Sequence, residues 1–197
     1  MAFKNRIVDA PLPENISTPR PIYYIMQTEL FNSLTIHRKA AALSVNNFSW
    51  VIPGRIAGCA VPYFSRGDDD AEWLAGQGVN VLVSHVMPSG KPAEKCARHG
   101  IEWVYYPIPD FDIPSDEVSY GELVGKIVAA MKEEKGVCVH CHAGIGRTGL
   151  TLVCAVGRYL SLPSDKAVAA VRAVRPLSVE TEEQMDLIRR FLDDRQD

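Results

Sequence analysis

The sequence predicts an α/β domain with a mostly parallel central sheet flanked by helices on both faces. Short apolar runs rich in β-branched residues, such as VNVLVS (79–84) and GVCVH (136–140), alternate with segments whose apolar residues recur at helical spacing. This alternation is typical of strand–helix–strand units, in which the strands are parallel. The 197 residues, of which 47% are apolar, suffice for one such domain with an extension.

The chain divides into an N-terminal extension, residues 1–45, and a folded domain, residues 46–197. Four prolines interrupt the first half of the extension, and the sequence predicts neither its role nor the oligomeric state. The domain opens with two short strands around the Pro53-Gly54 turn. A short helix follows at 68–78, because Asp68 to Asp70 suit a positive helix N-terminus and two glycines suit its stop.

The remaining elements alternate between strand and helix. We expect a buried strand at 79–86, a short helix at 91–100 and a strand at 101–109. Residues 118–135 form a helix, with Ser119 and Glu122 as its capping box. GVCVH is the central strand, and the helix after it runs from Arg147 to Leu160. Two more helices complete the domain, in SDKAVAAVRAVR (164–175) and ETEEQMDLIRRFLDD (180–194).

The most informative segment joins the central strand to the helix behind it. VHCHAGIGRTG (139–149) places a cysteine at the end of an apolar run and an arginine six positions later. Consecutive loop amides and a helix N-terminus favour a bound oxyanion, and Arg147 can hold two phosphate oxygens at once. The same positive surroundings favour the thiolate of Cys141, which is the nucleophilic form. The segment therefore predicts phosphoryl-transfer chemistry on Cys141.

The other residues of this segment have predicted roles in binding the phosphate. Gly144, Gly146 and Gly149 allow backbone conformations that side chains would forbid, so that several N–H groups can point inward together. The Thr148 hydroxyl can donate to the Cys141 sulfur and help to hold the thiolate. The predicted phosphate-binding residues are His142, Ala143, Gly144, Ile145, Gly146, Arg147 and Thr148.

Two other interpretations of the segment fit its residues less well. Cys138 and Cys141 have the C-x-x-C spacing of a redox pair, and with His140 and His142 they have the residue types of zinc ligands. In a strand, however, residues 138 and 140 share one face, whereas Cys141 already lies in the loop. Neither interpretation needs the glycines or Arg147. We expect no metal and no cofactor.

HCHAGIGRTG (140–149) resembles the His-Cys-(five residues)-Arg-Ser/Thr signature of cysteine-dependent protein tyrosine and dual-specificity phosphatases. NFSWVIPGRIAG (47–58), YPIPDF (106–111) and VRPLSVETEEQ (174–184) resemble segments of the small atypical dual-specificity phosphatases. The resemblance covers the chain from about Asn47 to the C-terminus. It implies the phosphotyrosine protein phosphatase fold and hydrolysis of phosphorylated protein substrates.

Phosphate-ester cleavage by a thiolate also needs an acid that protonates the departing oxygen. PIPDFDIPS (107–115) offers Asp110 and Asp112 in a loop after an apolar strand. The family's acid lies in a Pro-Asp loop, and Pro109-Asp110 matches that position. We expect Asp110 to be the acid, with Asp112 as the competing candidate, and at least one of the two to be a turn former.

The predicted mechanism has two steps. Cys141 attacks phosphorus while Asp110 protonates the leaving oxygen, which gives a phosphocysteine. Water then attacks the phosphocysteine with Asp110 as base, and Arg147 and the loop amides stabilise the equatorial oxygens throughout. Glu180 and Gln184 match polar groups that relatives place near the pocket rim, but a solvated helix face explains them equally well. We therefore leave them out of the catalytic set.

Composition bears on the partners and the compartment. The net charge of −3 gives no electrostatic reason to bind nucleic acid or an anionic membrane. No segment approaches ~18 consecutive apolar residues, and the first fifteen residues lack a signal-peptide core. Five cysteines without a disulfide spacing, one of them a predicted thiolate, favour a reducing compartment. We expect the protein in the cytoplasm or the nucleus.

The loop composition bears on the substrate. Phosphoinositide phosphatases of the superfamily often carry loop lysines that meet additional phosphates, whereas His142 and Ile145 stand at the variable positions here. RNA triphosphatase relatives need a broad basic surface, which the net charge does not suggest. We therefore expect a phosphotyrosine or mixed phosphoamino-acid substrate. Phosphoinositide hydrolysis, RNA 5′-phosphate hydrolysis and phosphate binding without turnover are the alternatives.

Overall fold

The central strand of the fold is β5, Gly136–His140, the strand that leads to Cys141. The structure is a computed structural model that describes residues 45–65 and 69–194. Its five-stranded sheet has the order β1-β2-β5-β3-β4, in which only the β1–β2 pair is antiparallel. The other strands are β1 (Ser49–Ile52), β2 (Ile56–Cys59), β3 (Val79–Ser84) and β4 (Glu102–Tyr105).

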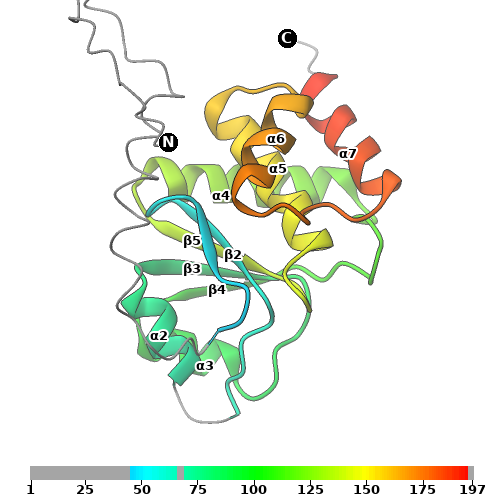
Figure 1. Ribbon diagram of the computed structural model, residues 1–197. Coiled ribbons are helices and arrows are strands. Elements are labelled where there is room, and N and C mark those ends of the chain that lie inside the picture. Colours follow the sequence, from blue (N-terminus) through cyan, green and yellow to red (C-terminus); the bar gives the residue numbers. More distant parts are fainter. Residues whose placement is uncertain (1–44, 66–68, 195–197) are drawn as a thin grey trace, which may run out of the picture.

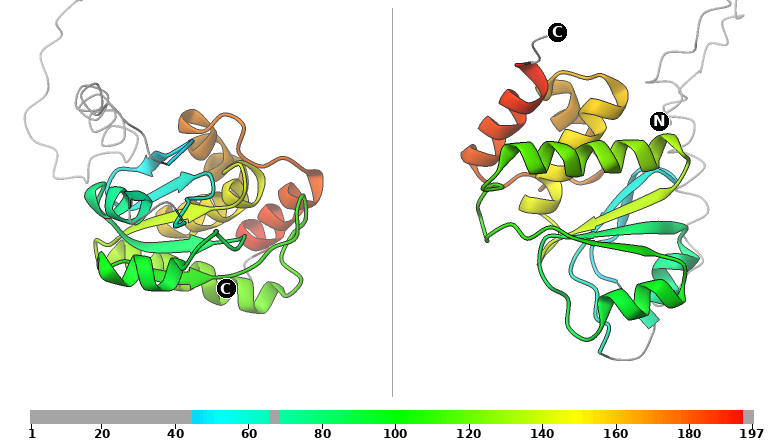
Figure 2. Two further views of the ribbon diagram at one scale, coloured as in Figure 1. Left: turned by 90° about the horizontal axis from the view of Figure 1, so that it is seen from below. Right: turned by 180° about the vertical axis from the view of Figure 1, so that it is seen from behind.

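Helices cover both faces of this sheet. Figure 1 shows α4, α5, α6 and α7 on one side and α2 and α3 on the other, and the views in Figure 2 agree. The helices are α2 (Asp69–Gly76), α3 (Pro92–Arg98), α4 (Glu117–Lys132), α5 (Gly146–Leu160), α6 (Ser164–Val174) and α7 (Glu182–Asp193). The predicted fold class, with its mostly parallel sheet and helices on both faces, is confirmed.

The alternation of side chains along β5 builds the two halves of the core. All five residues of this strand are buried, as expected for the middle strand of a covered sheet. Val137 and Val139 pack in the larger cluster, with residues of α4, α5 and α7. Cys138 packs in the smaller cluster, with Leu74 of α2 and Cys96 of α3. Successive side chains thus serve opposite faces, which fixes the register of β5 and the position of the loop after it.

Helix α5 is the central helix of the larger layer. Every residue from Gly146 to Gly157 is buried, so this helix packs on all sides. It ends at Leu160, and its C-cap, Ser161, adopts a left-handed conformation with φ 54° immediately before Leu162-Pro163. The N-terminus of α5 is therefore held rigidly against the sheet, at the carboxyl end of β5.

The predicted cap of α4 needs correction, and other predictions lie outside the described residues. Helix α4 begins three residues earlier than a Ser119 cap allows, because Asp116 is the N-cap and its carboxylate accepts from the Val118 N–H (3.0 Å). The predicted capping box of Ser119 and Glu122 is therefore wrong, and Ser119 instead lies within the first turn. Apart from the buried Val45, the predicted extension lies outside the described residues, as does Asp68. Among the helices that are described, none is long and apolar enough to cross a membrane.

Candidate active site

Cys141 lies in a loop between the carboxyl end of β5 and the N-terminus of α5. Residues 141–145 form this loop, called the phosphate loop below, and Cys141 is buried with a free thiol. Ile145, at the N-cap of α5, provides no side-chain cap. The first N–H groups of a helix have no partner within the helix, so an oxyanion can bind them. A thiol at the base of such an N-terminus has the arrangement that nucleophilic attack on a phosphate requires.

The three glycines of this segment are required for different structural reasons. Gly144 has φ +75°, and a Cβ there would overlap the Cys59 carbonyl. Gly146 and Gly149 do not have positive φ, and they are required because a side chain would not fit at either position. A Cβ at Gly146 would overlap the Glu180 carboxylate, and one at Gly149 would lie 2.5 Å from the Val179 nitrogen. The prediction that all three give unusual conformations is thus correct only for Gly144.

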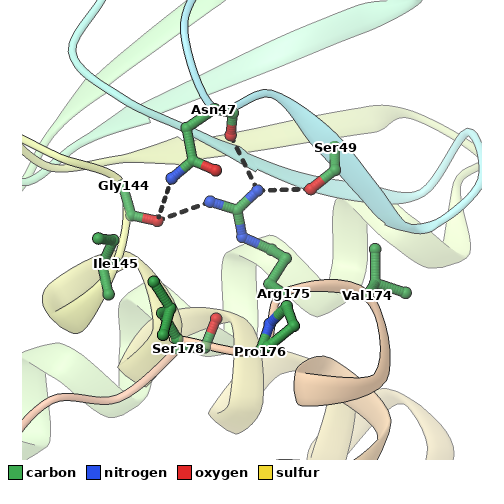
Figure 3. Close-up of a pocket in the computed structure, with 9 residues that line it drawn as sticks. Asn47, Ser49, Gly144, Ile145, Val174, Arg175, Pro176 and Ser178 are labelled. Atoms are coloured by element: carbon green, nitrogen blue, oxygen red, sulfur yellow. Dashed lines mark hydrogen bonds between the residues drawn. The ribbon is translucent and has the colours of Figure 1, made fainter.

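Two residues that the sequence did not single out anchor the phosphate loop. The Asn47 side-chain amide donates to the carbonyls of Ala143 (2.9 Å) and Gly144 (3.3 Å). Arg175 donates to the same Gly144 carbonyl through Nη2 (2.6 Å), as Figure 3 shows. In a trans peptide the N–H and the C=O point in opposite directions. Holding these two carbonyls from one side therefore turns the N–H groups of Gly144 and Ile145 to the other side.

Arg175 is itself fixed at the start of the sheet. Its Nη1 donates to the carbonyls of Asn47 (2.9 Å) and Gly58 (3.0 Å) and to Ser49 Oγ (2.5 Å). Burial lowers the pKa of Arg175, while Cys59, Cys138 and Cys141 oppose this shift. The guanidinium thus ties the phosphate loop to β1 and β2. Both anchors lie in segments that resemble the dual-specificity phosphatases, and this was the one signal in the sequence that could have identified them.

Arg147 brings the loop that carries the predicted acid, residues 107–115 and called the acid loop below, to the phosphate loop. Only 6% of its side chain is exposed. Its Nη1 donates to the Ile108 carbonyl (3.0 Å), and its Nη2 lies 2.5 Å from Asp110 Oδ1. Asp110 itself is 67% exposed. The structure therefore places Asp110 beside Arg147, on the solvent side of the site.

Asp112, the competing candidate, has another role in the structure. Its carboxylate accepts from the backbone N–H of the next residue, Ile113 (2.8 Å), which is a local contact. Its carbonyl accepts from Gln184 Nε2 (3.4 Å). Gln184 is fully buried, and its Oε1 accepts from the Glu180 N–H (2.9 Å). Gln184 thus lies between the acid loop and Gly146, whereas the side chain of Glu180, which is exposed, lies against Gly146.

The histidine before the nucleophile belongs to a buried hydrogen-bond chain. The Trp103 indole donates to Ser84 Oγ (2.8 Å), which lies 2.6 Å from His140 Nε2. His140 Nδ1 lies 3.2 Å from the Cys141 carbonyl. A carbonyl only accepts, so Nδ1 carries the proton and Nε2 accepts from Ser84. Burial lowers the pKa of His140 to about 4, so the ring is neutral near pH 7.

His85 forms a second buried chain that sequence reasoning did not identify. Its Nδ1 donates to the Tyr106 carbonyl (2.9 Å), and its Nε2 accepts from Thr151 Oγ1 (2.8 Å). Burial lowers its pKa to about 4, and the charge of Arg147 contributes in the same direction. The Tyr106 carbonyl lies two residues before Ile108, which holds Arg147. His85 therefore fixes the start of the acid loop against α5.

The remaining predicted residues have simpler surroundings. His142 and Ala143 are exposed, and Ile145 is half-buried. Thr148 is buried, but the predicted hydrogen bond to the Cys141 sulfur is not formed, since Thr148 Oγ1 has no partner among the described residues. Within that part of the chain no group of three His, Cys, Asp or Glu side chains could hold a metal ion.

Comparisons with known proteins find similarity to tyrosine and dual-specificity phosphatases. The family described as "polymorphic toxin system, DSP-PTPase phosphatase" matches residues 57–160. Protein tyrosine phosphatase domain-containing protein 1 of Mus musculus is 39% identical over 66 residues, which are 34% of this chain and 9% of that protein. Tyrosine-protein phosphatase cdc-14 of Caenorhabditis elegans is 27% identical over 72% of this chain and 21% of its own length. The chain thus spans a minor part of these curated relatives.

Solved structures show the same fold. The crystal structure of Tk-PTP in its active form has a TM-score of 0.64 and 28% identity, and the match covers 78% of this chain and 99% of that one. Kinase-associated phosphatase, solved with its catalytic-site cysteine replaced by serine, has a TM-score of 0.64 at 18% identity over 79% of this chain and 97% of its own. PTPMT1 in complex with PI(5)P has a TM-score of 0.64 at 13% identity over 75% and 95%.

Proposed function

The chain belongs to the DSP-PTPase phosphatase family of polymorphic toxin systems, and from this premise we propose that it hydrolyses phosphotyrosine and phosphoserine or phosphothreonine monoesters in proteins. The observation that carries the proposal is the contact between Arg147 and Asp110 at the mouth of the phosphate loop. It brings an acid, a phosphate-binding cation and the Cys141 segment into one site. A phosphocysteine mechanism needs these three groups in one site, and the contact supports that proposal.

Substrate binding starts with an exchange of partners on Arg147. A phosphate dianion competes with Asp110 for the guanidinium, because both offer oxygens to the same N–H groups. The N–H groups of the phosphate loop and of the first turn of α5 bind the remaining equatorial oxygens. Asp110 is then free to turn to the bridging oxygen of the ester. Phosphate binding and acid release are thus coupled through Arg147.

The chemistry then follows in two displacements. The Cys141 thiolate forms a bond to phosphorus as the ester P–O bond breaks, and Asp110, which takes up a proton from water once Arg147 has released it, gives this proton to the departing oxygen. In the second step Asp110 takes a proton from water while the water oxygen attacks phosphorus, and the sulfur leaves as thiolate. Inorganic phosphate is released, and the enzyme returns to its starting state. Gln184, buried between the acid loop and Gly146, is placed to keep that loop near the phosphate.

Several residues support an aryl phosphate as the preferred substrate. Phe111 follows Asp110 directly and exposes 64% of its surface, which is unusual for so large an apolar side chain and offers a face for an aromatic ring. The exposed loop positions carry no lysine that would meet additional phosphates.

The flanking segments favour a small atypical enzyme of the kind of dual-specificity phosphatase 23. Five free cysteines are consistent with a reducing compartment such as the cytoplasm.

The assignment of the acid is tested by two matched amide substitutions. Asp110→Asn should lower kcat for a small alkyl or phenyl phosphate about 10²- to 10⁴-fold, which is the usual contribution of a general acid. Asp112→Asn should lower it only slightly, because that carboxylate accepts one local N–H. The reverse pattern would assign the acid to Asp112.

The substrate class is tested by a panel. Phosphotyrosine and phosphothreonine peptides, a phosphoinositide and an RNA 5′-triphosphate are compared by kcat/KM, with release of inorganic phosphate as the readout. We expect the phosphotyrosine peptide to give the highest value and the lipid and the RNA the lowest. Equal or greater activity on the lipid or the RNA would contradict the protein-phosphatase proposal. Binding of all four without phosphate release would indicate a phosphate-binding module.

A further inference from the structure

The carboxylate of Glu180 lies against the first turn of α5, next to the groups that bind phosphate. A Cβ added at Gly146 would overlap this carboxylate, and the same Cβ would lie 3.2 Å from Gln184 Nε2. Gln184 Nε2 in turn donates to the Asp112 carbonyl of the acid loop (3.4 Å). Glu180 therefore approaches Gly146 from the side on which the acid loop, with Asp110, reaches the site.

The backbone just before Glu180 is strained. Val179 has φ +69°, a left-handed conformation that β-branched residues rarely adopt. Arg172 stabilises this conformation, because its Nε donates to the Ser178 carbonyl (3.0 Å) and its Nη2 to the Val179 carbonyl (3.2 Å). The Glu180 N–H donates to Gln184 Oε1 (2.9 Å). Contacts on both sides of the strained residue thus fix the backbone that places Glu180 against α5.

Helix α5 leaves room for this segment near its start. A Cβ at Gly149 would lie 2.5 Å from the Val179 nitrogen, just as one at Gly146 would overlap the Glu180 carboxylate. Figure 3 shows the coil that carries Ser178 beside the start of α5. Glycine weakens a helix relative to alanine, so both glycines are costly for α5 itself. The close approach of the Glu180 segment is therefore kept at the expense of helix stability.

The Glu180 carboxylate makes the rim of the site acidic. It is exposed, and it forms no hydrogen bond or ion pair with any residue that the structure describes. The Arg172 guanidinium donates to backbone carbonyls and not to this carboxylate. Asp110 and Asp112 add two carboxylates from the acid loop, whereas Arg147 is the cation that meets the phosphate. Once a phosphate has neutralised Arg147, the rest of a substrate faces carboxylates.

Charge on this rim distinguishes substrates by what they carry beside the scissile phosphate. Two unit charges about 7 Å apart shift a binding equilibrium by about threefold to tenfold, from bulk water to a partly shielded surface site. An ester with a second anionic group on its leaving side therefore binds more weakly than one with a neutral neighbour. We propose that Glu180 is a specificity-determining residue that selects against a second anionic group beside the phosphate, so that the site takes isolated phosphomonoesters. This role rests on the proposed function, because it narrows the substrate class of the same site.

The test compares the binding of two peptides that cannot be hydrolysed. Both carry the difluoromethylene phosphonate analogue of phosphotyrosine, flanked on each side by glutamate in one peptide and by glutamine in the other. Dissociation constants are measured by calorimetry on the full chain. We expect the unsubstituted protein to bind the glutamine peptide more tightly, and Glu180→Gln to reduce the ratio of the two dissociation constants at least about threefold. Glu180→Lys should reverse the preference.

A matched control changes the same charge elsewhere. Glu183 is an exposed acid in the first turn of α7, and Glu183→Gln should leave most of the ratio in place. A ratio that stays unchanged in Glu180→Gln, or that falls equally in both glutamine variants, would overturn the proposal. Failure of the unsubstituted protein to bind either peptide would overturn it as well, since the site would then not take a phosphate ester.

The outcome is independent of turnover. Neither analogue is cleaved, so the ratio is obtained whether or not the protein hydrolyses the corresponding phosphotyrosine peptides. Absence of hydrolysis of those peptides would contradict the proposed function, while the ratio of dissociation constants would still decide the role of Glu180.

Discussion

Replacement of Asn47 by glycine isolates the contribution of one loop anchor. Asn47 has φ +53°, which glycine adopts freely, so Asn47→Gly removes the side chain without straining the backbone. The carbonyl of this residue, which accepts from Arg175, is kept. What is lost is the amide that donates to Ala143 (2.9 Å) and Gly144 (3.3 Å).

The magnitude follows from these two bonds. Each neutral hydrogen bond contributes about 0.5–1.5 kcal/mol, and Asn47 is exposed, so we expect a total of about 1–2 kcal/mol. This energy holds the N–H groups of Gly144 and Ile145 on the side of the phosphate. If this energy favours the loop conformation that binds phosphate over conformations that do not, loss of the two bonds lowers the population of the binding conformation by up to about 5- to 30-fold. The loss should appear in kcat/KM for a small aryl phosphate.

The assay has a matched control in the neighbouring asparagine. Asn46→Gly introduces the same residue one position earlier, where the side chain makes no hydrogen bond to the described residues. Steady-state hydrolysis and urea unfolding are measured for both variants. We expect a loss of kcat/KM in Asn47→Gly that greatly exceeds the loss in Asn46→Gly. An Asn47→Gly enzyme with unchanged kcat/KM but lower unfolding free energy would refute the positioning role, since the bonds would then serve stability alone.

Two further predictions concern the loop and pH. Gly144→Ala should destabilise the fold by at least about 2 kcal/mol and abolish most hydrolysis, because the Cβ would overlap the Cys59 carbonyl at a φ of +75°. Urea unfolding measures the loss of stability, and the aryl phosphate assay measures the loss of hydrolysis. Wild-type values in both would contradict the close approach of Gly144 to Cys59. The pKa of His85 is about 4 in the fold and ordinarily 6.5, so the unfolded chain binds the proton first as the pH falls. The free energy of unfolding should therefore decrease between about pH 6.5 and pH 4, by about 3 kcal/mol for this group. Urea unfolding across this range checks the trend, and an NMR titration of His85 with a midpoint near 6.5 would show that the ring is not buried in neutral form.

The sequence predicted those parts of the site that are local in the chain. The strand, phosphate loop and helix around Cys141 occupy consecutive residues, so periodicity and glycine placement were enough to order them. The choice between Asp110 and Asp112 depended on which carboxylate reaches Arg147, 37 and 35 positions further along the chain, and the structure places Asp110 there. The first turn of α4 was misplaced because SDEVS offers both Asp116 and Ser119 as caps, and either suits a helix start.

The anchoring roles of Asn47 and Arg175 could not be derived from local sequence chemistry, because both residues are distant in sequence from the phosphate loop. Asn47 lies 96 residues before Ala143, and Arg175 reaches carbonyls that lie 128 and 117 residues away. Neither residue belongs to a chemical motif by itself, and an exposed asparagine or a helix-end arginine is ordinarily a solvated surface residue. Their roles follow from the sheet, which brings β1 and the end of α6 to the same side of the phosphate loop.

The central claim is that Cys141 carries the phosphoryl group during turnover. Its most direct test is acid quenching of the enzyme within the first turnover of an aryl phosphate, followed by mass analysis of its peptides. We expect one added phosphoryl group on the peptide that contains Cys141, and none in Cys141→Ser, which should also release no phosphate. Phosphorylation of another residue, or undiminished hydrolysis by Cys141→Ser, would contradict it.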